Sequence, residues 1–415
     1  MTARPERSTD QRASALSVWS SVVAEGVIED LLAPEGWAYA SSPPVEPYDP
    51  GRFHALFGRD ALIFSLQVLP LRPDIADATL RSLAALRGRC SDPDTEEEPG
   101  RIVHEYWPVA PSWLVEQGWP MRDGGIRYYG SADATSWFLV LLAARSNRAL
   151  ADELRQAWMG AGAWLERALD QGGGVIRSGP RTRPGGLSQQ GWRDTRDPQR
   201  SHGGGIVRTD GSTPRSPLAD ADSQGAAVAA LRALAWLDPG RAAHWRGLES
   251  RLRARVTATF RPDLLALEAD GTPVFGAGSH LGWLLWSGAL DGSAVGEAAK
   301  RLAQPDVLTP FGVRTLSSRH PQFRAEAYHR GAVWPFDSWL SWGGLRATGH
   351  HQAAEQVRRG VLTALEALGR APELYAVTQS GRLESITRAN RVQAWTVGAA
   401  WALAESWDGR AISVD

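Results

Sequence analysis

The sequence has almost no cysteine, because Cys90 is the only one in 415 residues. A single thiol excludes an internal disulfide and a metal site built from several thiolates. No lysine- or arginine-rich run is present, and 45 basic residues balance 46 acidic ones. The chain therefore lacks the positive surface that binding to nucleic acid or to an anionic membrane requires.

Long apolar stretches are missing as well. The sequence contains no run of about 18 apolar residues, the length needed to span a bilayer. Residues 1–12 are polar and lack the apolar centre of a secretory signal. We therefore expect a cytoplasmic protein whose partner is a small, polar and neutral molecule. The sequence does not indicate an oligomeric state.

Tryptophan, in contrast, is abundant: 19 residues against 7 tyrosines and 9 phenylalanines. Burying tryptophan requires a partner for its indole N–H, so many of these side chains are expected to be half exposed. An indole can stack on the C–H face of a sugar ring. Any single tryptophan is more often a core residue, so only those in loops rich in glycine and proline are ligand candidates.

Helical periodicity dominates the chain, in two kinds of segment. Residues 134–144 and 226–237 are apolar on more than one side, as in helices of an inner layer. Other segments carry charge on one face only, as in outer helices, namely residues 72–87, 151–169, 239–260 and 351–369. About twelve helices of alternating kind predict an all-α fold, an (α/α)6 barrel of six helical hairpins.

Long loops separate these helices, at residues 33–58, 88–129, 172–219, 307–328 and 371–390. Loops of this length inside a domain are usually functional, and here they are expected to form a pocket at one end of the barrel. No linker composition is visible. We therefore predict one catalytic domain over residues 1–415, with a flexible terminus at 1–15.

Two loops place carboxylates beside aromatic residues. The segment 190–197 contains Trp192, Asp194 and Asp197, and Glu373 follows about 180 residues later in a Pro-Glu-Leu-Tyr sequence. Hydrolysis of a glycosidic bond needs one carboxyl to protonate the leaving oxygen and another to activate water or attack the sugar. The pair predicts a glycosidase.

Other charged residues are candidates for sugar binding. Arg59 and Asp60 precede an apolar helix, where Asp60 could cap the helix or bind sugar hydroxyls, and Asp133 has the same two possible roles. Glu105 follows His104 in an aromatic segment and is expected to face the pocket. The run 96–98 of three glutamates is interpreted as a solvated loop.

The segment 328–335 combines His329, Arg330 and Trp334 around a glycine that permits close backbone approach. No second histidine or cysteine stands at metal-ligand spacing, and no Gly-x-Ser-x-Gly sequence occurs. We expect neither a metal ion nor another cofactor. The segment is interpreted as part of a sugar pocket, with a helix start around a buried tryptophan as the alternative.

Seven segments together resemble the glucosidase domain of glycogen debranching enzymes, a family related to glucoamylases and mannosylglycerate hydrolases. The resemblance covers the chain from about residue 50, and its segments are 57–63, 98–105, 128–133, 190–197, 286–288, 328–335 and 372–374. It implies an inverting (α/α)6 enzyme with Asp194 as general acid and Glu373 as general base. Asp197 is the alternative acid.

The resemblance also implies that Arg59 and Asp60 hold a terminal glucose and that four further residues line the pocket, namely Asp133, Gln224, Arg330 and Trp334. The sugar face would stack on Trp192 or Trp334. Two other classes stay open: a sugar epimerase or lyase of the same fold, in which His104 and His329 would move protons, and a carbohydrate-binding protein without turnover.

Overall fold

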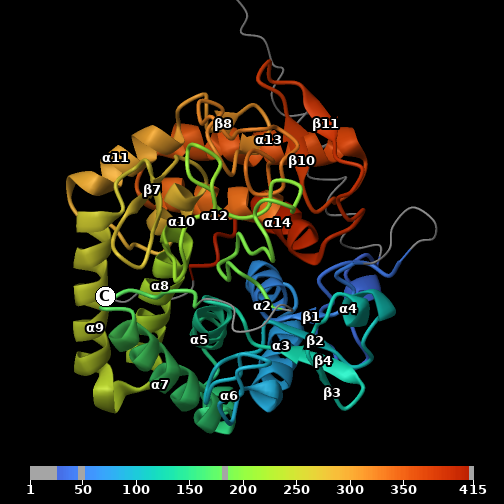
Figure 1. Cartoon of the computed structure of the whole chain (residues 1–415), viewed down its shortest axis with the longest axis vertical. Helices are drawn as coiled ribbons and strands as arrows, with labels where there is room; N and C mark the ends of the chain where they lie inside the picture. The colour runs from blue at the N-terminus through green and yellow to red at the C-terminus, as the bar shows by residue number, and fades with distance from the viewer. Residues whose placement is uncertain (1–25, 45–51, 180–185, 411–415) are drawn as a thin grey trace, which may run out of the picture.

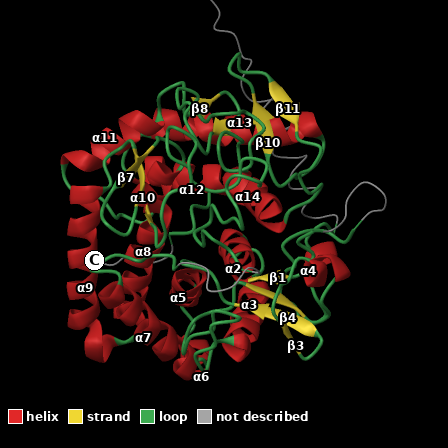
Figure 2. Cartoon of the chain, in the orientation of Figure 1, coloured by secondary structure: helices red, strands yellow, loops and turns green. Residues whose placement is uncertain are grey.

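Six buried helices form the centre of the molecule. The computed structural model describes residues 26–44, 52–179 and 186–410, and helices are its main regular elements (Figure 2). The inner helices are α2 (Gly58–Gln67), α5 (Ala134–Ala144), α8 (Ala221–Leu237), α10 (His280–Trp286), α12 (Pro335–Ala347) and α14 (Ala394–Ala404). Each contacts the next in chain order, and α14 contacts α2, so the six close into a ring (Figure 1).

Amphipathic helices cover this ring from outside. They are α3 (Pro73–Leu86), α7 (Arg155–Gln171), α9 (Ala242–Thr259), α11 (Ser293–Leu302) and α13 (His351–Leu368). Each packs on the inner helix that precedes it: α3 on α2, α7 on α5, α9 on α8, α11 on α10 and α13 on α12. Short helices α4 (Ser112–Glu116) and α6 (Arg148–Glu153) and 3-10 turns at Glu29–Leu31 and Pro239–Arg241 complete the helical part. This two-layer ring is consistent with an α/α-barrel fold.

Helix positions follow the sequence patterns closely. The inner helix predicted over residues 134–144 is α5 to the residue, and the outer helix predicted over 351–369 is α13. The helix predicted over 226–237 begins earlier, because Asp220 accepts a hydrogen bond from the Ser223 N–H and caps α8. The helix predicted from 151 is divided into α6 and α7 where Leu154 leaves the helical conformation (φ −92°, ψ 14°).

Short strands were not expected from the sequence. In the described residues they form four antiparallel sheets: β1 (Leu56–Phe57), β2 (Glu105–Trp107), β4 (Gly125–Tyr128) and β3 (Met121–Arg122) in that order; β5 (Ala219–Asp220), β6 (Leu264–Leu267) and β7 (Pro273–Phe275); β8 (Leu308–Thr309) with β9 (Gly312–Val313); and β10 (Tyr375–Val377) with β11 (Leu383–Ser385). Strands of two to four residues are too short to show alternation. The fold is helix-rich with small loop sheets.

The tryptophans are more buried than expected. Trp137, Trp192, Trp283, Trp334 and Trp339 are among the largest fully buried side chains. Several satisfy the indole N–H inside the protein: Trp339 donates to the Trp407 carbonyl at 2.8 Å, and Trp283 donates to Asp337 at 2.7 Å. For these two side chains the N–H finds a partner within the core, so solvent exposure is not needed. The Nε1 atoms of Trp137 and Trp192, in contrast, are buried without a hydrogen-bond partner among the described residues.

None of the helices in the described residues combines the length and the apolar character that a bilayer span requires. The residues predicted to form a flexible terminus, 1–15, lie outside the described part.

Candidate active site

Loops at one end of the helical ring enclose a cavity of about 210 Å³. Its lining comes from the start of α2, the β2 strand, the loop before α8, the loop before α12 and the loop before α14. The lining includes the charged, polar and aromatic side chains of Arg59, Asp60, His104, Glu105, Trp192, Asp194, Tyr328, His329, Trp334, Glu373, Gln393 and Trp395. The pocket predicted from the long loops is therefore present.

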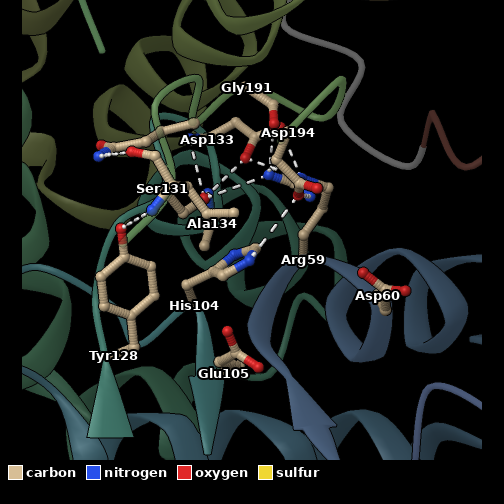
Figure 3. Close-up of polar contacts among 12 residues, drawn as sticks. Arg59, Asp60, His104, Glu105, Tyr128, Ser131, Asp133, Ala134, Gly191 and Asp194 are labelled. Atoms are coloured by element: carbon tan, nitrogen blue, oxygen red, sulfur yellow. Dashed lines mark hydrogen bonds and ion pairs between the residues drawn. The ribbon is translucent and has the colours of Figure 1, made fainter. Parts of the chain in front are cut away.

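Arg59 is the buried centre of the site's charge network. Its Nε donates to both carboxylate oxygens of Asp133 at 2.9 Å, and Nη1 donates to Asp194 Oδ2 at 2.9 Å (Figure 3). Nη2 donates to the Gly191 carbonyl at 3.0 Å. The side chain is only 2% exposed. Arg59 lines the cavity, but its hydrogen bonds mainly hold the loop that carries Asp194.

Asp133 acts behind the cavity. It lies at the N-cap position of α5, yet its side chain makes no cap hydrogen bond. Ser131 Oγ accepts the Ala134 N–H at 3.1 Å instead and donates to Asp133 Oδ1 at 2.9 Å. Asp133 is fully buried and is not among the residues that line the cavity. Its role is to orient Arg59, rather than to contact a ligand or to cap the helix.

Asp194 has one engaged oxygen and one free oxygen. Oδ2 accepts from Arg59 and lies 3.7 Å from His104 Nε2, whereas Oδ1 has no partner among the described residues. The side chain is 26% exposed into the cavity. Burial raises the pKa of Asp194 to about 6, against the opposing charge of Arg59. Burial holds the pKa of His104 well below its usual range, so this imidazole is neutral.

The loop carrying Asp194 depends on a glycine. A Cβ at Gly191 would lie 2.9 Å from Asp220 Oδ2, tighter than packing allows. Asp220 is the cap of α8, so the loop packs directly on the start of an inner helix. The glycine lets Trp192 and Asp194 reach the cavity.

Glu373 accepts hydrogen bonds at both oxygens. The Tyr328 hydroxyl donates to Oε1, and the Asn390 N–H donates to Oε2 at 3.2 Å. The side chain is 2% exposed. Burial raises the pKa of Glu373 to about 7, and the two hydrogen bonds oppose that rise. Burial and the neighbouring Glu373 keep the pKa of Tyr328 well above its usual range, so Tyr328 keeps its proton and remains a donor.

Two more carboxyls face the same cavity. Asp60 lies in the first turn of α2, makes no cap, and accepts a weak bond from Gln393 Nε2 at 3.4 Å. Burial raises its pKa well above its usual range. Glu105, on β2, accepts the Trp107 indole N–H at 2.9 Å, and burial raises its pKa to about 8. Both groups can donate a hydrogen bond to a sugar hydroxyl when protonated.

Aromatic rings form one wall of the cavity. Trp192 meets His329 and Trp334 edge-to-face, with ring centroids 5.2 and 5.6 Å apart. His329 stacks on Trp334, and its Nδ1 accepts the Gly205 N–H at 3.0 Å. Burial keeps His329 neutral by lowering its pKa well below the usual range. The rings are fixed by protein contacts and offer a rigid apolar surface.

Besides Asp133, three predicted residues lie away from this cavity. Asp197 is 45% exposed and accepts the Gln199 N–H at 2.9 Å within its own loop. Gln224 is buried on α8 and bonds the backbone of Ile176. Arg330 lines a second cavity, described below. None of the three is among the lining residues.

Some lining residues were not predicted. Tyr328 stands at the start of a motif that the sequence analysis selected, so its signal was present. Gln393 and Trp395 begin α14, about 20 residues after Glu373, and nothing local in the sequence marks them as site residues. Glu96, interpreted as solvated, is instead half-buried, and it accepts bonds from Tyr128 and Gln190. The described residues contain no group of three side chains placed to hold a metal ion.

Several carboxyls with raised pKa values and fixed aromatic rings in one cavity are the groups that hydrolysis of a glycosidic bond requires. The profile of the mannosylglycerate hydrolase MGH1-like glycoside hydrolase domain matches residues 97–376, which is more than half of the chain. The chain belongs to this family. The resemblance found in the sequence is thus confirmed at the level of glycoside hydrolases, and the matching family is not that of the debranching enzymes. The search of curated proteins finds no match.

Solved structures share the fold. A GH63 mannosylglycerate hydrolase from Thermus thermophilus in complex with Tris and D-glycerate is 13% identical, with a TM-score of 0.65, covering 94% of this chain and all of the other. The same enzyme in complex with glucose is 15% identical, with a TM-score of 0.63, over 94% and 99% of the two chains. A protein described as a wild-type glycosidase is 15% identical, with a TM-score of 0.62, over 97% and 99%.

Proposed function

We propose that this glycoside hydrolase removes a terminal α-linked glucosyl unit with inversion, using Asp194 as general acid and Glu373 as general base. The observation that carries the proposal is that these two carboxyls line one cavity with opposite hydrogen-bond patterns. The resemblance of the sequence motifs to debranching enzymes further supports activity of the debranching type on a small α-glucoside.

The hydrogen bonds of the two carboxyls support these two roles. Glu373 receives a donor at each oxygen, which favours a carboxylate that can take a proton from water. Asp194 is oriented through Oδ2 and leaves Oδ1 free to carry a proton to a glycosidic oxygen. The inverting geometry places an acid and a base about 6.5–9.5 Å apart with water between them, a separation we predict for this pair.

The pKa values support the same pairing. Burial raises the pKa of Asp194 to about 6 and that of Glu373 to about 7, so both carboxyls titrate near neutral pH. The two groups titrate as a pair, and the reactive form carries one proton, on Asp194.

The size of the cavity supports a small substrate. Its volume of about 210 Å³ lies below the roughly 300–1,000 Å³ common for larger ligands. One sugar ring fits best, which supports exo action. The sugar would donate to and accept from Asp60 and Glu105, with its apolar face on Trp192 or Trp334. We further propose that the whole chain is a single (α/α)6 catalytic domain.

The test is a panel of α-linked disaccharides and glucosyl or mannosyl glycerates, with the released sugar followed by NMR. The α-glucoside should be cleaved and give β-glucose first. Release of α-glucose first would exclude inversion, and cleavage of mannosides alone would replace the glucosyl assignment.

Glu373→Gln tests the base. The variant keeps the size of the side chain but cannot accept a proton, so kcat should fall about 10²–10⁴-fold. Glu384→Gln is the matched control, since Glu384 lies on the neighbouring strand β11, away from the lining residues. Activity of Glu373→Gln close to the parent enzyme would remove Glu373 from this role.

A further inference from the structure

A second cavity, of about 570 Å³, lies beside the loop that carries Tyr328 and His329. Its lining shares no residue with the catalytic cavity. Four arginines line it against two carboxylates, which gives the cavity an excess of positive charge. The arginines are Arg200, Arg324, Arg330 and Arg388, and the carboxylates are Asp210 and Glu326.

Three of these arginines have no carboxylate partner within ion-pair distance among the described residues, namely Arg324, Arg330 and Arg388. The Arg324 side chain makes no polar contact to the described protein at all. Nε of Arg330 and Nε of Arg388 are buried without a hydrogen-bond partner. Buried guanidinium donors normally have partners, so unpaired arginines gathered around one cavity indicate a missing acceptor.

The electrostatics agree with this geometry. Burial and the nearby charge of Arg324 lower the pKa of Arg330, because the two like charges repel each other. Within the described residues, no carboxylate relieves that repulsion at contact distance. An anion between the two guanidinium groups would reverse the sign of this interaction.

Two of the arginines, Arg330 and Arg388, are also held in place. Arg388 Nη2 donates to the His202 carbonyl at 3.1 Å and to the Glu326 carbonyl, and Arg330 Nη2 donates to the Pro198 carbonyl at 3.2 Å. The walls are joined as well, since the Tyr328 N–H donates to the His202 carbonyl at 3.1 Å and the His329 N–H to the Gly203 carbonyl at 2.8 Å. Each anchored guanidinium therefore keeps its remaining donors free in a fixed orientation, which reduces the entropy lost on binding.

We propose that this arginine cavity, defined by Arg324, Arg330 and Arg388, binds a phosphate-bearing small molecule at a site separate from the catalytic cavity. Arginine suits phosphate because the planar guanidinium donates two parallel hydrogen bonds to its oxygens. The volume accommodates a phosphorylated sugar as well as phosphate itself. The site also explains why Arg330, in a motif selected from the sequence, does not face the catalytic residues.

Isothermal titration of the full chain with inorganic phosphate and with glucose 6-phosphate tests the site at constant ionic strength. Arg324→Gln should weaken binding by at least about tenfold, because hydrogen bonds between charged partners are the strong ones. Since the Arg324 side chain makes no polar contact to the described protein, this change should leave folding intact. Arg359→Gln, an exposed change on α13, is the control and should bind as the parent does. Tighter binding of glucose 6-phosphate than of phosphate would show that the site also recognises the sugar. Equal binding of the two probes would show that it recognises the phosphate group alone.

Initial rates separate this site from the catalytic cavity. Phosphate should not compete with the glycoside substrate. Three results would overturn the proposal. The first is that neither probe binds saturably, and the second is that Arg324→Gln and Arg388→Gln bind the probes as tightly as the parent protein does. The third is purely competitive inhibition by phosphate that Arg324→Gln leaves unchanged.

Discussion

Asp194 and Asp197 show how strongly position decides the role of a side chain. Both follow Trp192 in one loop, and the sequence alone leaves either as the acid. Asp194 lies in the cavity against Arg59, whereas Asp197 accepts a bond within an exposed turn. Burial is what raises the pKa of a carboxyl enough to keep its proton near neutral pH. The free oxygen of Asp194 is therefore the proposed proton donor.

Asp194→Asn and Asp197→Asn test this difference. Asp194→Asn should lower kcat about 10²–10⁴-fold on a glucoside with a poor leaving group. It should be much less harmful with glucosyl fluoride, because fluoride leaves without a proton. Asp197→Asn should act as the parent enzyme on both substrates. The reverse pattern, measured by initial rates, would make Asp197 the acid.

The two carboxyls proposed as acid and base, Asp194 and Glu373, also predict the pH dependence of the reaction. Catalysis requires one protonated and one ionised carboxyl, and the pair has pKa values of about 6 and about 7. The ratio kcat/KM should therefore follow a narrow bell with its maximum between these values, and the two limbs belong to the pair as a whole. In Glu373→Gln one limb should disappear from the residual activity. A flat profile from pH 5 to 8 would contradict this assignment.

At the scale of elements, periodicity predicted helices well and the site only in part. Residues 134–144 form α5 as expected because a helix of eleven apolar or small residues is a strong local signal. The sheet formed by β1, β2, β4 and β3 gave no such signal, yet its pairing places Glu105 opposite Phe57 and Tyr128. Gln393 reaches the cavity only because α14 closes the ring against α2. Contacts across the ring depend on tertiary structure, which local patterns do not encode.

Glu96 joins strand β4 to the loop that carries Asp194, although its segment was interpreted as a solvated loop. It has a left-handed backbone (φ 57°), which is unfavourable for a residue other than glycine. Its carboxylate accepts from the Tyr128 hydroxyl on β4 at 2.7 Å and from Gln190 Nε2 at 2.6 Å. Gln190 belongs to the loop that carries Asp194. Glu96 thus supports the loop of the proposed acid, Asp194, without lining the catalytic cavity.

Glu96→Gln should weaken both hydrogen bonds, since a neutral amide oxygen is a poorer acceptor than a carboxylate. We expect a loss of about 1.5–3 kcal/mol in unfolding free energy. The value of kcat should fall moderately while the limbs of the pH profile stay in place, because the catalytic carboxyls keep their contacts. Glu116→Gln, on α4, serves as the control for urea unfolding and for kinetics. A shifted pH profile would instead indicate that Glu96 acts on the pKa values.

At the scale of the whole molecule, the end of the helical ring concentrates buried acid groups. Burial raises the pKa of Asp60, Glu105, Asp194 and Glu373, all of which line one cavity. Within the described part of the chain, only Asp194 among these four forms an ion pair, with Arg59. Protonation of these groups therefore stabilises the folded state. The folded protein therefore loses some stability when these buried carboxyls ionise.

Glu105 makes this loss measurable, because it forms no ion pair among the described residues and its pKa is raised by burial from 4.5 to about 8. The folded protein holds the Glu105 proton more tightly than the unfolded chain does. Its contribution to stability is complete below about pH 4.5 and is lost as the pH rises toward 8, at on the order of 1 kcal/mol per pH unit. Glu105→Gln cannot ionise, so its Tm should fall less than that of the parent between pH 5 and 8. The variant should therefore be the more stable protein at pH 8, as calorimetry would show.

Parallel Tm curves for the two proteins between pH 5 and 8 would mean that Glu105 is ionised in the folded state throughout this range. Its proposed role as a hydrogen-bond donor to the sugar would then fail as well.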